Sequence, residues 1–115
     1  MSEEFQLNWA TQLRKGILEF AILSALARQR LYGYDLVRTL GSVDSLVISE
    51  GTIYPILNRL KRESYVDTTI EESPSGPARK YYELTARGRA QLQRMNTHWQ
   101  SLQDGIEKLQ KGPKR

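Results

Sequence analysis

Residues 92–109 read LQRMNTHWQSLQDGIEKL, and they contain the clearest apolar repeat of the chain. Its apolar residues follow one another at intervals of three and four: Leu92, Met95, Trp99, Leu102, Ile106 and Leu109. A narrow stripe at this spacing is typical of a seam between two helices, whereas a helix that lies on a globule has a broader apolar face. The stripe covers about two and a half heptads, which is too short for an autonomous coiled coil.

The length of the helix that carries this stripe indicates that it protrudes. A helix from Thr85 to Leu109 would be about 38 Å long, whereas a compact domain of this size has a radius of gyration of about 13 Å. A protruding apolar stripe needs a partner to cover it. We therefore expect a homodimer whose interface contains the six stripe residues quoted above.

The composition limits the class of protein. A chain of 115 residues with 39% hydrophobic residues is sufficient for one small domain. The chain has no cysteine, which excludes a disulfide framework, a zinc knuckle and a thiol nucleophile. Its amino terminus is acidic and no long apolar run follows, so we expect no signal peptide, no membrane span and a cytoplasmic protein.

Positive charge is concentrated in the second half of the chain. The net charge is +4, but residues 1–50 hold five Lys and Arg against six Asp and Glu, whereas residues 51–115 hold twelve against seven. An uneven basic surface suggests a polyanionic partner, although a solvated face of ordinary helices would give the same count. Charge alone leaves both interpretations open.

The first half of the chain predicts three helices. Residues 7–27 form one whose apolar residues occupy nearly all sides beyond Ile17, so it is buried by more than one neighbour. A short helix opens at residues 32–34 and ends at Gly41, and residues 42–48 connect it to a third helix. The third helix starts at Ser49 or Thr52, and Pro55 favours the later start because it would then lie in the first turn.

The second half predicts a hairpin and the long helix. Residues 65–70 and 80–84 have strand character, and residues 72–77 between them contain two prolines and a glycine, which predicts a long tip. Thr85 suits the N-cap of the last helix, which Gly112 and Pro113 terminate. The order predicts a mainly α, α+β fold: a winged helix-turn-helix (1–84), a dimerisation helix (85–111) and a basic tail (112–115).

Three blocks of the sequence resemble the PadR-like transcriptional regulators. They are LYGYDL at 31–36, SEGTIYPILNRL at 49–60 and GPARKYYELT at 76–85, followed by Gly88. Their combination and order are specific, and the similarity extends from about Leu13 to Leu109. The resemblance implies the short subfamily with one carboxy-terminal dimerisation helix, and a dimeric repressor that leaves its operator when a small molecule binds. The connection between Leu40 and Ser49 is longer and more apolar than the resemblance implies.

A recognition helix buries one side and presents the other to the major groove. The predicted third helix buries its isoleucines and leucines and leaves polar side chains that suit base edges and phosphates. In the hairpin, a cation beside a tip rich in proline and glycine can contact the minor groove and the phosphate backbone. The predicted DNA-contact residues are Tyr34, Ser49, Thr52, Tyr54, Asn58, Arg59, Arg62, Arg79 and Lys80.

Trp99 has two interpretations. An aromatic residue at helical spacing is usual in a helix interface. Some members of the resembled family hold flat aromatic compounds between such tryptophans, and by that resemblance Trp99 and Gln103, with Trp9 and Leu13 from the first helix, line a site for a small aromatic effector.

Nothing in the sequence predicts an enzyme, a metal site or a cofactor. His98, the single histidine, lacks the partners for a triad or a metal site, and the glycines are too widely spaced for a phosphate-binding loop. The sequence favours a sequence-specific, DNA-binding transcriptional regulator that acts as a repressor and binds a pseudo-palindromic operator. The alternative is a winged-helix protein-interaction module, which would ignore DNA.

Overall fold

The computed structural model describes residues 2–46 and 48–112. Its elements in chain order are α1 (Glu3–Ala25), β1 (Leu31–Tyr32), α2 (Gly33–Gly41), a 3₁₀ turn (Asp44–Leu46), α3 (Glu50–Arg62), β2 (Val66–Ser73), β3 (Gly76–Leu84) and α4 (Ala86–Lys111). The predicted mainly α winged helix fold with a long carboxy-terminal helix is confirmed. Most of the predicted basic tail, from Pro113 onward, lies outside the described residues.

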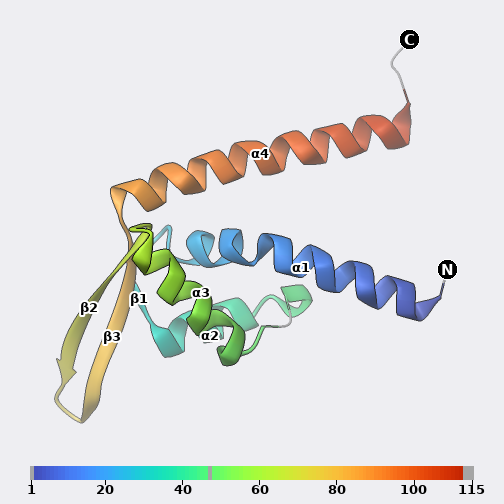
Figure 1. Cartoon of the computed structure of the whole chain (residues 1–115). Coiled ribbons are helices and arrows are strands. Elements are labelled where there is room, and N and C mark those ends of the chain that lie inside the picture. The colour runs from blue at the N-terminus through green and yellow to red at the C-terminus, as the bar shows by residue number, and fades with distance from the viewer. Residues whose placement is uncertain (1, 47, 113–115) are drawn as a thin grey trace.

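The molecule is elongated because two long helices leave its centre in the same direction. In Figure 1, α1 and α4 extend to one side, with the start of α1 and the end of α4 at the same extremity, whereas the β2–β3 hairpin occupies the opposite end. The principal extents are 63 × 34 × 22 Å and the radius of gyration is 17.2 Å, against about 13 Å for a compact domain of this size. The predicted protrusion of the last helix is therefore present.

Helix α4 begins where its sequence predicted. The Thr85 hydroxyl accepts a hydrogen bond from the Gly88 backbone N–H at 3.0 Å, the usual N-cap arrangement. The first part of its apolar stripe belongs to the protomer's own core, because Leu92 is buried and Met95 packs against the buried cluster. Leu92 and Met95, the first two residues of the predicted seam, therefore pack within the protomer.

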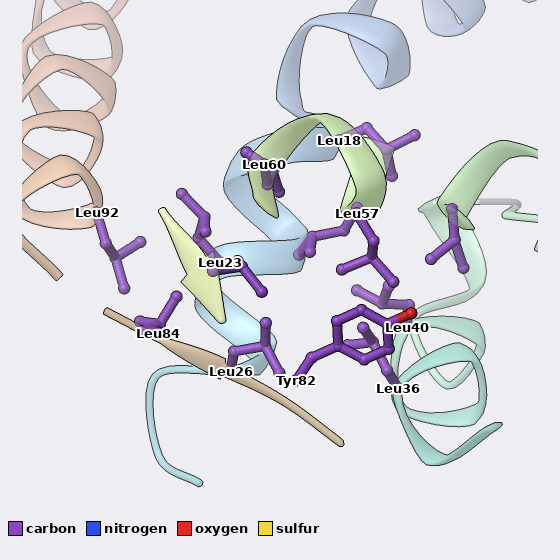
Figure 2. Packing of buried hydrophobic residues seen from close by; sticks show 13 residues of the cluster. Leu18, Leu23, Leu26, Leu36, Leu40, Leu57, Leu60, Tyr82, Leu84 and Leu92 are labelled. Carbon is purple, nitrogen blue, oxygen red and sulfur yellow. The ribbon is translucent and has the colours of Figure 1, made fainter. Parts of the chain in front are cut away.

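The core lies where α1, α2, α3 and the hairpin meet. Figure 2 shows leucines of these helices directed toward one another around Tyr82, with Leu92 of α4 beside Leu84. The fully buried side chains include Ile22, Leu23, Leu26, Leu36, Ile53, Leu57, Leu60 and Val66. Burying a large aliphatic side chain contributes about 1.5–3 kcal/mol, so this cluster holds α3 against the rest of the domain.

Helix α3 starts earlier than the sequence favoured. It begins at Glu50 with Ser49 in the N-cap position, and the Ser49 carbonyl accepts the Thr52 N–H at 3.1 Å. The favoured start at Thr52 is therefore wrong. Pro55 lies in the second turn, where its missing N–H leaves the Gly51 carbonyl without a helical partner. Gly51 is exposed to water, and burial of the apolar face of α3 outweighs the loss.

The hairpin is longer and its tip shorter than predicted. Ser73 pairs with Gly76, so the two residues between them form the whole tip, and the expected long tip over 72–77 is wrong. The register of the ladder shifts between Glu71 and Ser73, and strand pairing then continues to Ser73 and Gly76. This irregularity accommodates Pro77, since proline cannot donate to a regular ladder and occurs at bulges.

The sheet has a third strand that the sequence did not predict. Residues Leu31 and Tyr32 of β1 pair antiparallel with Tyr82 and Tyr81, which gives the strand order β1-β3-β2. The two-residue strand ties the start of α2 to the middle of the hairpin. Among the helices of residues 2–46 and 48–112, none has the length and apolar character that a membrane crossing requires.

Candidate nucleic-acid interface

Helix α3 presents a polar face away from the core. Ile53, Leu57 and Leu60 are buried, which leaves Asn58 and Arg62 exposed on the opposite side. At its amino end the exposed hydroxyls of Ser49 and Thr52 lie 3.1 Å apart and share a hydrogen bond. These four polar residues belong to the predicted contact set, and they are exposed on α3 and at its amino end. 

A hollow separates this helix from the hairpin, and four other predicted contact residues line it. Its volume is about 550 Å³, and its walls come from the start of α2, from α3 and from the hairpin. The predicted residues on these walls are Tyr34, Tyr54, Arg79 and Lys80. They are separated by up to 46 positions along the chain, and the pairing of β1 with β3 brings them together.

Aromatic rings hold the cations of this surface. The Arg79 guanidinium lies 4.8 Å from the centre of the Tyr32 ring, and the Arg38 guanidinium lies 5.8 Å from the Tyr34 ring. Such cation–π contacts favour one orientation of a long side chain and leave its N–H groups free to bind a phosphate. Tyr32 and Arg38 were not among the predicted residues. The spacing of Tyr34 and Arg38, four apart on a helix, was the available signal.

The Tyr82 phenol inside the hollow remains neutral. Burial raises the pKa of the Tyr82 hydroxyl above its ordinary value of 10.0, and the neighbouring Tyr54 raises that pKa further. A neutral phenol can donate a hydrogen bond to a phosphate oxygen, whereas a phenolate would repel it. The electrostatic character of the hollow therefore comes from Arg79 and Lys80, for which no ion pair is present among the described residues.

Arg59 does not line the hollow, and carboxylates engage its side chain. Its guanidinium forms an ion pair with Glu19 of α1, and a second one with Glu63 at 3.6 Å. The side chain therefore spans from α3 to α1, away from the hollow. This ion pair could not be predicted from the sequence, because Glu19 precedes Arg59 by 40 positions.

A second groove lies between α1 and α4. It has a volume of about 650 Å³, and its lining includes Leu13, Phe20, Arg94, Met95 and Trp99. The Phe20 and Trp99 rings lie 6.3 Å apart at 59°, so Trp99 packs edge-on against α1 within its own protomer. Of the four predicted effector residues, Leu13 and Trp99 line this groove, whereas Trp9 and Gln103 lie outside it.

Comparisons with known proteins agree on one family. Residues 22–94 match the sequence model of the transcriptional regulator PadR-like family. The structure is similar to a PadR family transcriptional regulator from Eggerthella lenta, with 31% identity and a TM-score of 0.84 over 96% of each chain. It is also similar to a PadR-like transcriptional regulator from Bacillus cereus, with 35% identity and a TM-score of 0.79 over 89% of this chain and 99% of the other.

One similar structure contains nucleic acid. Bacillus subtilis PadR, solved in complex with operator DNA, has 27% identity and a TM-score of 0.61 over 69% of this chain and 46% of its own. Among curated proteins, an uncharacterized protein from Lysinibacillus sphaericus is 26% identical over 100 residues, which are 85% of this chain and 92% of that protein. The chain therefore belongs to the PadR-like family of DNA-binding transcriptional regulators, which are not enzymes, and it has the short form with one long carboxy-terminal helix.

Proposed function

We propose that the protein binds a pseudo-palindromic operator as a homodimer and represses transcription from it. The observation that carries this proposal is the placement of Tyr34, Tyr54, Arg79 and Lys80 around one hollow beside the exposed face of α3. A helix and a wing on the same side of a domain can contact the major groove and the adjoining backbone of one duplex. The similarity to Bacillus subtilis PadR, which was solved in complex with operator DNA, supports operator binding by this chain.

The exposed end of the α4 stripe supports the dimer. Leu102, Ile106 and Leu109 are 48%, 55% and 84% exposed, and on α1 the side chains of Phe5 and Trp9 are each 55% exposed. The free ends of α1 and α4 lie at the same extremity of the molecule (Figure 1), so these apolar side chains belong to the same pair of protruding helices. Exposed apolar residues grouped in this way are typical of an association surface.

A dimer would present two reading surfaces to one duplex. In dimeric helix-turn-helix proteins the two half-sites are separated by one helical turn, about 34 Å, or by a multiple of it. Selection of bound duplexes from a random pool tests the proposal directly, since it reports binding, symmetry and spacing together. We expect an inverted repeat. A pool without any enriched sequence would favour the alternative, a winged-helix interaction module.

Two arginines of α3 provide a matched test of the contact surface. We expect Arg62→Ala to weaken operator binding and to reduce the slope of log K against log salt concentration by about 1, since one phosphate contact is lost. Arg59→Ala should leave this slope unchanged, because Arg59 pairs with Glu19 and Glu63. Titrations at several salt concentrations measure both slopes, and a slope for Arg62→Ala equal to that of the unaltered protein would remove Arg62 from the interface.

We further propose that the α1–α4 groove binds a small aromatic effector. Its lining combines the Phe20 and Trp99 rings with aliphatic side chains, and it includes the cationic guanidinium of Arg94. Apolar walls with a few polar groups are typical of ligand sites. The positive charge of Arg94 favours an anionic aromatic ligand over a cationic one.

Tryptophan fluorescence tests the effector proposal. We expect a flat aromatic carboxylate to quench the emission of Trp99, because the ligand would lie against its ring in the groove. Trp9 is 55% exposed and lies outside the groove, so Trp9→Phe should retain the quenching and Trp99→Phe should abolish it. The same aromatic ring as a cationic amine is the comparison ligand. If Trp99→Ala binds the carboxylate as tightly as the unaltered protein, the groove is not the site.

A further inference from the structure

We propose that Gly33 is a positioning residue for DNA binding. Its missing side chain lets the Tyr54 ring of α3 lie directly on the first turn of α2, and this contact holds the recognition helix in a fixed position relative to the hairpin. The inference rests on the proposed function, since the property that it affects is affinity for the operator.

The space around Gly33 is occupied by Tyr54. A Cβ atom at Gly33 would lie 2.6 Å from Tyr54 Oη, 3.1 Å from Cε1 and 3.3 Å from Cζ. Carbon atoms make favourable contacts at about 3.5–4.0 Å, so even alanine would collide with the ring. All three nearest atoms belong to the same edge of the phenol. That edge therefore rests on the glycine backbone.

Backbone conformation does not explain this glycine. Gly112 is the glycine with a positive φ among the described residues, and Gly33 is an ordinary first residue of a helix. Glycine is one of the poorest helix formers, so its presence at the start of α2 needs another reason. Close approach of a neighbouring side chain is such a reason, and at Gly33 the neighbour is the Tyr54 ring.

Tyr54 connects the parts of the proposed DNA surface. It is half-buried against the core, it lines the hollow with Arg79 and Lys80, and it lies close enough to Tyr82 of β3 to raise the pKa of that residue. The ring thus stands between α2 and the hairpin at the amino-terminal half of α3. A binding constellation works only when its groups are held within about 0.5 Å of their productive positions. Displacement of this ring would change how α3 and the hairpin cations face one duplex.

Substitution of the glycine tests the inference, with a matched control in the same helix. We expect Gly33→Ala to lower operator affinity about tenfold, the equivalent of about 1.4 kcal/mol, while the circular dichroism spectrum remains that of the folded protein. Gly41 is the last residue of α2, and a Cβ there would meet nothing within 4 Å. Gly41→Ala should therefore bind the operator with unchanged affinity.

Repeating the Gly33→Ala substitution in a Tyr54→Phe variant tests whether the contact with Tyr54 causes the loss of affinity. Tyr54→Phe removes Oη, so the atom nearest to an added Cβ becomes Cε1 at 3.1 Å. In that background we expect the Gly33→Ala penalty to fall to about threefold or less, because aromatic and helical contacts are otherwise kept. Should Gly33→Ala alone fail to fold, recovery of folding by Gly33→Ala/Tyr54→Phe supports the same contact, and failure of both variants overturns it.

The outcomes separate this inference from the proposed function. Wild-type affinity for Gly33→Ala, or the same penalty in both backgrounds, overturns the positioning role. Arg79→Ala in the same titrations reports on the DNA surface itself. If Arg79→Ala weakens binding and Gly33→Ala does not, the surface stands and the role of Gly33 fails; if neither has an effect, the proposed surface fails.

Discussion

Replacement of Gly88 by alanine is expected to lower the free energy of unfolding by about 2–3 kcal/mol. A Cβ at Gly88 would lie 2.0 Å from the Tyr65 carbonyl oxygen and 3.0 Å from its carbon. These are backbone atoms, and the same carbonyl accepts the Thr85 N–H at 3.2 Å. The Tyr65 carbonyl and the Thr85 N–H cannot move apart without breaking this hydrogen bond at the junction of β3 and α4. The substitution therefore forces the first turn of α4 away from the start of β2.

Gly105 provides the control for this prediction, since it lies in the same helix and a Cβ there would meet nothing within 4 Å. Gly105→Ala is expected to stabilise the protein by up to about 1 kcal/mol, because alanine is the better helix former. Urea unfolding at one protein concentration measures both changes, and a fixed concentration is needed because association alters apparent stability. Equal urea midpoints for Gly88→Ala and the unaltered protein would contradict the close contact between Gly88 and the Tyr65 carbonyl.

The second large effect is expected from charges in the exposed part of the α4 stripe. We predict that Leu102→Glu with Ile106→Glu converts the dimer to a monomer and lowers affinity for a two-half-site operator about a hundredfold. Both side chains are about half exposed in the protomer, so the substitutions cost the isolated fold little. In a dimer interface the same carboxylates would be buried without partners. Sedimentation gives the mass and titration of the operator gives the affinity.

The matched control places the same charges at the same spacing on another face of α4. Thr97 and Ser101 are exposed and four residues apart, as Leu102 and Ile106 are, so Thr97→Glu with Ser101→Glu adds equal charge to one helix. This control should remain dimeric and keep most of its affinity. A dimer of unchanged stability for Leu102→Glu with Ile106→Glu would move the interface away from the stripe.

The long helix and its cap could be predicted from the sequence because their determinants are local. The spacing from Leu92 to Leu109 and a threonine before the first turn are sufficient for α4. The start of α3 was missed because the hydrogen bond lost at Pro55 can be read from the local sequence. The burial of the apolar face of α3, which outweighs that loss, depends on packing against other elements. The two-residue strand β1 has no periodicity to detect, and it exists only because β3 lies beside it.

The sequence predicted which residues belong to the candidate interface better than it predicted how they lie relative to one another. Residue type and turn chemistry suggested the cations of the hairpin, and the structure places them at the hollow with Tyr54. The sequence could not indicate that Arg59 pairs with Glu19, since helix α3 leaves several directions open to a long side chain. It also gave no reason to examine Gly33, because that reason is the position of a ring 21 residues later.

The short link between the hairpin and α4 has a consequence for target choice. Thr85 alone separates β3 from α4, and its hydroxyl donates to the Ser64 carbonyl at 2.6 Å while its N–H donates to Tyr65. These contacts fix the hairpin relative to α4. In the proposed dimer, the pairing of the two α4 helices would therefore set the distance between the two hairpins. One inserted base pair rotates a half-site by about 34° around the duplex. We therefore expect operator affinity to depend on the spacing between the half-sites as strongly as on their base sequence.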